Sequence, residues 1–536
     1  MTKVRLKVPK RSGFDKSFQN ILTTKCGTLT PILVDELIPN TKVHLEDIIT
    51  AKLPPLASDT YMRVNLKVEA FFVPTRLLYH GFEAWITKEP LKNVPMNKTY
   101  TALTPVLHIT NTEGSYFGHG TLADYLGIRN AYLPTSSTLD VNIFPFLAYH
   151  RIYDDFYRNV QVQTKVFNDI SSDVASLWYN GSETHAPLYT LPYATIGSAT
   201  TSGKEKYLLS EQFADGVHLG DLRQRNFGFD YFTNAFPTAT EAAQAITFNT
   251  SGSTGSFTIP ALRAANSLQQ FAERNQMAGY RLQDFVNANY GGNLSSGVAQ
   301  RSICLGSAEI PVYSKGVYQT NNFDTTGTSL QNPFANSTGA QVGAADCKGA
   351  CTLVSDFTAE EPGYLMVLAS LVPHVTYANG INRMMLRYNA QYSQVDMANP
   401  LLQNVGNEEI NGIELTGSQA NLTQVFGYNQ RFGSWKTRVD ELHGLLRDGQ
   451  SLDSFALQRS VTGNPTISSS FLQIPTNFMD QVSAVAAQIS NYGCWIDAFH
   501  NYKVSMPLAQ YSIPSLQDPA YEHGHDVTVQ ISGSRL

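Results

Sequence analysis

The sequence contains the residue types that most often carry chemistry, but their spacing matches no catalytic motif. It has no Gly-rich phosphate loop followed by Lys and Ser/Thr, no G-x-S-x-G elbow, no H-E-x-x-H pair and no dinucleotide fingerprint. Glu360 and Glu361 are adjacent, as are Glu408 and Glu409, whereas a glycosidase needs two carboxylates that face each other across a cleft. We interpret both pairs as turn charges and expect no enzymatic activity and no cofactor.

Cysteine and histidine offer two weak candidates for a metal site. Cys347 and Cys351 form the sequence C-K-G-A-C, but no second cysteine pair and no histidine stands at the spacing of a zinc finger. His523 and His525 lie in the polar sequence EHGHD, where imidazoles are more often solvated than bound to metal. We therefore expect no metal ion. The five cysteines are an odd number in 536 residues, which favours a reducing compartment over a disulfide framework.

Charge is scarce and unevenly distributed. Only 15% of the residues are charged, 11% are aromatic, and the formal net charge is −6. Protein interfaces are depleted in charge and enriched in Tyr and Phe, so this composition predicts extensive contact with other protein. Up to Lys25, in contrast, seven cations accompany one anion. Residues 1–25 are predicted to form a basic arm with an anionic partner, and a solvated terminus without a ligand is the alternative.

Aromatic residues beside arginines are a second candidate for nucleic-acid binding. Such groups occur from Arg151 to Arg158 and from Tyr428 to Phe432. They could stack on unpaired bases while the guanidinium groups neutralise phosphate. The alternative is that the rings belong to the hydrophobic core and the arginines to its rim.

Strands dominate the predicted elements. In the sequence YMRVNLKVEAFFV from Tyr61, apolar Met62 to Phe72 alternate with polar Arg63 to Glu69, which is typical of a half-buried strand. Residues 41–53 are predicted to be its partner strand. Aromatic and branched residues predict further strands from Gly363, Ile381 and Cys494.

Helices are few, and long polar segments separate the elements. Apolar residues at three-and-four spacing predict helices after Pro74, from Phe144 and from Ala261. Segments rich in Gly, Ser, Thr, Asn and Pro cover residues 171–226, 238–260 and 320–350. Loops of this length are uncommon in a compact chain unless they are functional or packed by a partner. Scattered antiparallel strands with such insertions predict a sandwich or a jelly roll that carries surface loops.

Several segments, taken in order, resemble the major capsid protein of microviruses, the small icosahedral single-stranded DNA phages, and are most similar to the gokushovirus branch. These segments are KRSGFDKSF from Lys10, GTLTPILVDELIPNTK from Gly27, FFVPTRLLYHGFEAWI from Phe71, FPFLAYHRIYDDFYR from Phe144, GYLMVLASLVPHVTYANGINRMM from Gly363 and VFGYNQRFGSWKTRVDELHGLLR from Val425. The segment between DYFTNAFP and ALRAANS is short, whereas many gokushoviruses carry a long insertion there that builds a threefold protrusion. Residues 171–226 are the competing candidate for such a protrusion.

The resemblance implies an all-β fold, namely a single eight-stranded antiparallel jelly roll with long inserted loops and a few helices. Residues 26–536 would form this capsid domain, and the basic arm would face inward. About sixty copies would form a T=1 icosahedral shell around circular single-stranded DNA. A small basic DNA-binding protein, an internal scaffolding protein, a DNA pilot protein and a host-surface receptor are the expected partners.

Five of the cations in the arm are the candidate DNA-contacting residues: Lys3, Arg5, Lys7, Lys10 and Arg11. No secretory signal and no apolar run long enough to span a bilayer is visible, so we expect a virion protein made in the bacterial cytoplasm without membrane insertion. The alternative from another class is a carbohydrate-binding or carbohydrate-active β-sandwich protein. A tail or spike fibre is a third interpretation, although it would predict sequence repeats.

Overall fold

The structure is a computed structural model, and its main body is a pair of facing β-sheets. It describes residues 2–8, 11–79, 82–87, 104–110, 116, 118–128, 138–167, 204–238, 263, 267–268, 270–271, 274, 282–291, 300–318, 341–386, 407–430, 432–484, 488–508 and 525–531. Sheet I contains β2 (Ser12–Asp15), β3 (Phe18–Thr24), β15 (Cys494–Met506), β5 (Thr41–Lys52) and β11 (Gln341–Ala359). Sheet II contains β4 (Thr30–Leu37), β12 (Gly363–Pro373), β6 (Val64–Pro74) and β10 (Ile303–Tyr318).

The strand order of these sheets is that of a jelly roll. β2 and β3 both pair with β15, so they count as one interrupted edge strand and the nine strands reduce to eight. Numbered 1 to 8 in chain order, the strands are β2 with β3, β4, β5, β6, β10, β11, β12 and β15. The order of neighbouring strands is then 1-8-3-6 in sheet I and 2-7-4-5 in sheet II. The predicted eight-stranded antiparallel jelly roll is therefore confirmed.

The two sheets enclose one hydrophobic core. Alternate residues of β5, among them Leu45 and Ile49, pack in the same cluster as Leu66 and Val68 of β6. This alternation is the pattern that the sequence showed from Val64 to Phe72, because successive residues of a strand point to opposite faces. The predicted pairing of residues 41–53 with this strand is wrong. β5 pairs with β15 and β11, and it faces β6 across the core.

A forked hairpin joins the sheets. Residues 313–318 of β10 pair with residues 341–346 of β11, while the rest of β10 pairs with β6 and the rest of β11 with β5. The ladder of β10 is bulged between Cys304 and Gly306. A Cβ atom on Gly306 would lie 2.0 Å from the carbonyl oxygen of Leu353 in β11, so only glycine permits this approach.

Sheet II is covered on its second face by an inserted subdomain. Side chains of Phe71, Tyr364 and Met366 point away from the first core and pack in a second cluster with Phe146 and Tyr149. Every residue of β12 is consequently buried, which explains its continuous apolar sequence. The insertion contains η1 (Thr75–Leu77), α1 (Phe82–Thr87), β7 (Thr104–Thr110), α2 (Leu122–Tyr125), β8 (Thr138–Asn142), α3 (Phe144–Ile152), the π-helical turn η4 (Tyr153–Tyr157), β9 (Lys204–Tyr207) and, farther along the chain, α6 (Leu282–Tyr290).

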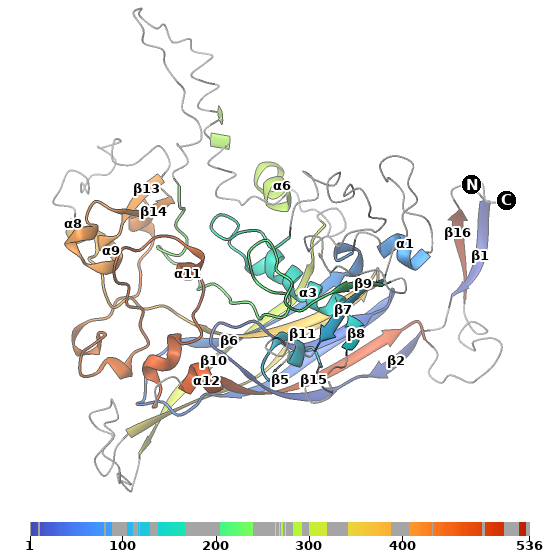
Figure 1. Cartoon of the computed structure of the whole chain (residues 1–536), viewed down its shortest axis with the longest axis horizontal. Helices are drawn as coiled ribbons and strands as arrows, with labels where there is room; N and C mark the ends of the chain where they lie inside the picture. Colours follow the sequence, from blue (N-terminus) through green and yellow to red (C-terminus); the bar gives the residue numbers. More distant parts are fainter. Residues whose placement is uncertain are drawn as a thin grey trace, which may run out of the picture.

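A lobe lies between β12 and β15 in the chain and extends beyond one end of the sheets (Figure 1). Its elements are α8 (Arg383–Leu386), β13 (Asn407–Asn411), α9 (Ile413–Thr416), η7 (Gln419–Asn421), β14 (Val425–Gln430), α10 (Gly433–Lys436), η8 (Gly444–Leu446), η9 (Asp453–Phe455), α11 (Ser469–Leu472), η10 (Phe478–Val482) and α12 (Gln488–Tyr492). At the opposite end, β1 (Thr2–Val8) and β16 (His525–Ile531) form a two-stranded ribbon that stands apart from the sheets in Figure 1.

The remaining predicted elements have mixed outcomes. The strands from Gly363 and Cys494 are confirmed as β12 and β15, and the helix from Phe144 is confirmed as α3. The strand expected from Ile381 is wrong, because Arg383–Leu386 is helical. The helix expected after Pro74 is split into η1 and α1, and most of the helix expected from Ala261 lies outside the described residues.

The three predicted loops are described only in part. Residues 171–203, 239–260 and 320–340 lie outside the described residues. Residues 341–350 belong to β11 rather than to a loop. Leu209, Phe213 and Leu219 of the first predicted loop are buried in the second core. These described parts are therefore built into the body of the protein.

An ion pair fastens the insertion to sheet II. The guanidinium of Arg225 donates to both carboxylate oxygens of Glu69 in β6, at 2.6 and 3.2 Å, and to the hydroxyl of Ser370 in β12 at 3.1 Å. The hydroxyl of Tyr157 also donates to Glu69. Both charged side chains are largely buried, so loss of the cation would leave a carboxylate without its counter-charge in a poorly hydrated site.

We predict that Arg225→Met lowers the free energy of unfolding of the unassembled chain by about 3 kcal/mol in urea denaturation. Arg76→Met is the matched control, because Arg76 and Glu361 form a pair that is about one third exposed and contributes at most about 1 kcal/mol. Equal losses in the two variants would contradict the assigned role of Arg225.

Candidate nucleic-acid and assembly surfaces

The predicted basic arm contributes strands to two different parts of the fold. Residues 12–24 include β2 and β3 of sheet I. Lys3, Arg5 and Lys7 lie in β1, where they pair in register with Gln530, Thr528 and Asp526 of β16. No local pattern in either segment predicts this pairing of residues from the two ends of the sequence.

Of the other two predicted DNA contacts, Lys10 and Arg11, the structure describes only Arg11. Lys10 lies outside the described residues. Arg11 donates hydrogen bonds to the carbonyl and side-chain oxygens of Asn40. The arrangement thus brings three of the five predicted cations onto one strand and places Arg11 at the edge of the body.

The arginines of the aromatic segment 151–158 are engaged within the protein. Arg151 pairs with Asp155 at 3.1 Å and Arg158 pairs with Asp154 at 2.6 Å, each at i,i+4 spacing. Tyr153 is buried in the second core. These contacts favour the core interpretation over base stacking for this segment. In the second such segment, Arg431 lies outside the described residues.

The weak metal candidates do not form a cluster where the chain is described. Cys347 and Cys351 are both in β11, with Cys347 buried and Cys351 half-buried. Burial raises the pKa of the Cys351 thiol to about 11, which keeps it protonated at neutral pH. His523 lies outside the described residues, and His525 begins β16. Within the described ranges, no group of three or more His, Cys, Asp or Glu residues is placed to bind a metal ion.

The lobe contains a buried ionic cluster that the sequence did not predict. Arg383 of α8 pairs with Glu408 of β13 at 3.1 Å and with Glu414 of α9 at 3.0 Å. Glu408 also accepts a hydrogen bond of 3.0 Å from the hydroxyl of Tyr231 and is fully buried, so its interpretation as a turn charge is wrong. Glu361, in contrast, pairs with Arg76 in a partly exposed position.

Two carboxylates share one guanidinium in this cluster, so one negative charge is not compensated. Burial, opposed by the nearby charge of Arg383, raises the pKa of Glu414 to about 7. A glutamate in the unfolded chain titrates near 4.5. Between these values the native state holds the proton that the unfolded state has lost, so the contribution of Glu414 to stability falls as pH rises through this window.

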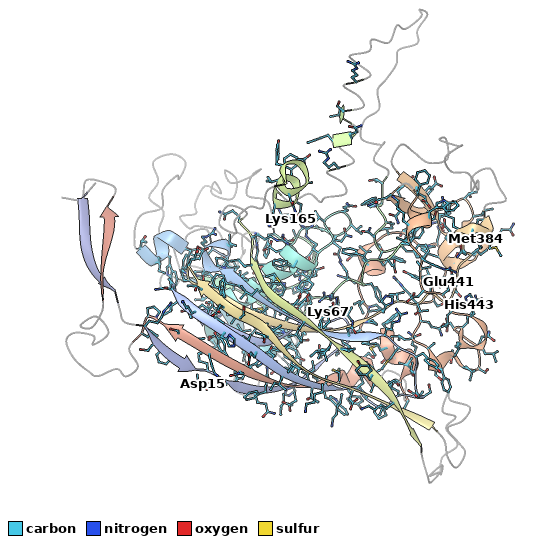
Figure 2. All side chains as sticks on the ribbon, turned by 180° about the vertical axis from the view of Figure 1, so that it is seen from behind. Asp15, Lys67, Lys165, Met384, Glu441 and His443 are labelled. Atoms are coloured by element: carbon cyan, nitrogen blue, oxygen red, sulfur yellow. The ribbon has the colours of Figure 1, made fainter. Side chains whose placement is uncertain are left out.

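A cavity of about 770 Å³ adjoins this cluster. Glu414 and Arg383 line it together with the exposed side chains of Met384, Trp435 and Lys436. Met384, Glu441 and His443, which also line it, lie close together in the lobe in Figure 2. No motif of the sequence predicts this cavity, although the order Trp435, Lys436, Thr437, Arg438 places an aromatic residue beside cations.

None of the described helices is long and apolar enough to cross a bilayer. The described features include a β-sandwich and exposed large apolar side chains. Such features serve association with other macromolecules.

We predict that the wild-type melting temperature decreases from pH 5 to pH 8 more than that of Glu414→Gln. The titration of Glu414 is worth at most about 3 kcal/mol, because its pKa lies about 2.5 units above the ordinary value. The amide can still accept hydrogen bonds from Arg383 and the Asn411 backbone. Glu360→Gln, at an exposed position, should follow the wild type, and parallel curves for wild type and Glu414→Gln would exclude this titration.

Comparisons with known proteins place the chain in one family. The chain matches the family model described as "Capsid protein (F protein)" over residues 2–516. It is 25% identical to "Capsid protein VP1" of Chlamydia phage 1, over 95% of this chain and 96% of that protein. It is 24% identical to "Capsid protein VP1" of Bdellovibrio phage phiMH2K, over 94% of this chain and 95% of that protein. Because the family model covers residues 2–516, which include all eight strands of the frame, we conclude that the chain belongs to the capsid protein (F protein) family of bacteriophages.

Proposed function

We propose that this chain is the building block of a closed T=1 shell of about sixty copies that encloses circular single-stranded DNA. The observation that carries the proposal is the capsid-family match from residue 2 to residue 516 on a jelly-roll frame. The role is structural: the chain associates with copies of itself and converts no substrate. Its location is the virion, and its synthesis takes place in the cytoplasm of the bacterial host.

The architecture divides rigidity and recognition between different parts. The two sheets and the forked hairpin supply a fixed frame, and the insertion and lobe present large apolar side chains to solvent, including Phe229, Tyr290 and Trp435. Each contact between copies can be weak, because a subunit held by several neighbours leaves only when all contacts break. Closed rotational symmetry keeps such contacts from continuing into a filament.

Packaged DNA requires positive charge that the chain as a whole lacks. The formal net charge is −6, so the shell cannot neutralise phosphate through its average composition. The cations of the arm, Lys3, Arg5, Lys7, Lys10 and Arg11, are the proposed inward contacts. A small basic DNA-binding protein shares this task, an internal scaffolding protein and a DNA pilot protein act in assembly and delivery, and surface loops contact a host receptor.

The mass of the assembly tests the proposed stoichiometry. Sixty copies of a 59.1 kDa chain weigh about 3.5 MDa before DNA is counted. We expect native mass spectrometry and electron microscopy of the chain, expressed with its viral partners, to show closed particles of that protein mass. A monomer with saturable glycan binding or turnover would instead support the carbohydrate-binding alternative.

The arm is tested by replacing the five proposed contacts, Lys3, Arg5, Lys7, Lys10 and Arg11, with Gln, which keeps the length of β1 and its register with β16. If all five contact phosphate, the slope of log affinity for single-stranded DNA against log salt should become shallower by up to about 3.5. DNA retained per particle should fall as well. Deletion of residues 1–11 serves as the comparison, because it removes both the charges and the strand. Unchanged DNA content and salt slope in the Gln variant would exclude the arm as a DNA contact.

A further inference from the structure

The two sheets differ in what covers their outer faces. The insertion packs on sheet II, whereas alternate residues of β15 in sheet I point outward and are exposed. Figure 1 shows α3 and β7 on one side of the sandwich and β15 and β2 along the other. Sheet I therefore presents an open, twisted surface of paired strands.

The pairing register places the outward residues of sheet I in rows across β3, β15, β5 and β11. The first row contains Thr23, Trp495, Lys52 and Asp346; the second Ile21, Asp497, Thr50 and Lys348; the third Gln19, Phe499, Ile48 and Ala350. Strand pairing fixes this arrangement, so the side chains of one row lie side by side and the rows follow one another at a two-residue spacing.

Large apolar side chains are concentrated in these rows. Ile21 is 74% exposed, Trp495 47%, Ile48 45% and Phe499 43%. A cluster of this kind on an open sheet marks a binding surface. Trp495 and Phe499 are four residues apart on one strand, a separation of about 13 Å at the usual rise per residue.

Cations flank the two rings. Lys52 is the register partner of Trp495, and Lys348 is that of Thr50. Both lysines are exposed and have no ion-pair partner within the described part of the chain. Lys25, also exposed, follows β3 by one residue.

The anions of the same rows do not balance these cations. Asp346 pairs with Lys315 at 2.7 Å, so its charge is already compensated. Asp497 accepts a hydrogen bond of 2.7 Å from the neutral side chain of Gln19 and keeps its negative charge between the two rings. Lys52 and Lys348 together therefore leave one net positive charge in the three rows. An anionic polymer with stackable rings is complementary to both features.

We propose that the outer face of sheet I is a binding site for single-stranded DNA, in which Trp495 and Phe499 stack on unpaired bases while Lys52 and Lys348 contact phosphate. This inference rests on the proposed function, since it locates the cargo on a particular face, and it adds a site separate from the arm. Thr23, Thr50 and Gln19 stand between and beside the rings, where they offer hydrogen bonds to base edges.

An open β-sheet with exposed aromatic residues is a physically suitable platform for unpaired bases. Every base has a π-face, so stacking on a ring tolerates any sequence, as a packaged genome requires. A protein partner would have to place acidic side chains opposite Lys52 and Lys348 as well as bury the apolar side chains, whereas a nucleic acid supplies a phosphate with every base. The charge arrangement therefore favours nucleic acid as the occupant.

Binding of a fluorescein-labelled oligo(dT) of sixteen nucleotides to the full-length chain, followed by anisotropy at two salt concentrations, tests the site. We expect Trp495→Ala and Phe499→Ala each to weaken binding about tenfold, with Phe499→Tyr close to wild type. Lys52→Gln with Lys348→Gln should make the salt dependence shallower by about 1.4, the value for two phosphate contacts on a single strand. All four residues are exposed, so melting temperatures should be unchanged.

Trp435→Ala is the matched control, because Trp435 is also exposed and also stands beside a lysine, but lies in the lobe. Wild-type affinity in this variant supports the assigned face. Equal losses in Trp435→Ala and Trp495→Ala, or full affinity in the double variant Trp495→Ala with Phe499→Ala, would overturn the proposal. Loss of particle assembly in that double variant with unchanged oligo(dT) binding would assign the face to a protein partner and also overturn it. Absence of particles with the wild-type chain would count against the proposed function, a separate result.

Discussion

The strand β12 in the interior of sheet II is buried on both of its faces, and the rest of the molecule is arranged around that constraint. β12 has no solvent-facing side, so it needs sheet I on one face and the insertion on the other. All elements of the insertion lie between β6 and β10 in the chain. The chain therefore leaves the frame after β6 and returns to it at β10. The frame can then carry large insertions without losing the strand order of the jelly roll.

Several buried charged residues form ion pairs between different elements of the structure. Arg225 and Glu69 join the insertion to sheet II, and Arg383 with Glu408 and Glu414 joins α8 to the rest of the lobe. Arg223 similarly pairs with Asp215 and donates to the buried ring of His150 within the second core. Such pairs contribute less to net stability than apolar packing of the same volume would, but an alternative packing that separates them is strongly disfavoured.

The sequence predicted the elements whose pattern is local and failed where distant residues decide the structure. Alternation from Val64 to Phe72 identified β6 and its core-facing side, and β15 begins at Cys494, as predicted. The apolar run of β12 identified a strand, but such a run does not reveal what covers each face. The segment from Ile381 carries strand-forming residues, yet Arg383 is held by Glu408 and Glu414 from other elements, and α8 forms there instead.

The candidate surfaces were predictable to a smaller extent. Local charge pointed to the arm, because clustered cations are visible in one dimension. Trp495 and Phe499 were hidden, since Ile496 and Ala498 on the opposite face of β15 are also apolar and alternation alone does not say which side is open. Their grouping with Ile21 and Ile48 depends on strand pairing across more than 440 residues of sequence.

The forked hairpin of β10 and β11 has a mechanical consequence. Each sheet continues into the other through unbroken strands, so one sheet cannot slide over the other without rupturing main-chain pairs in both. We therefore expect each subunit to resist shear between its two sheets. A change in the diameter of a shell would then come from movements between whole subunits.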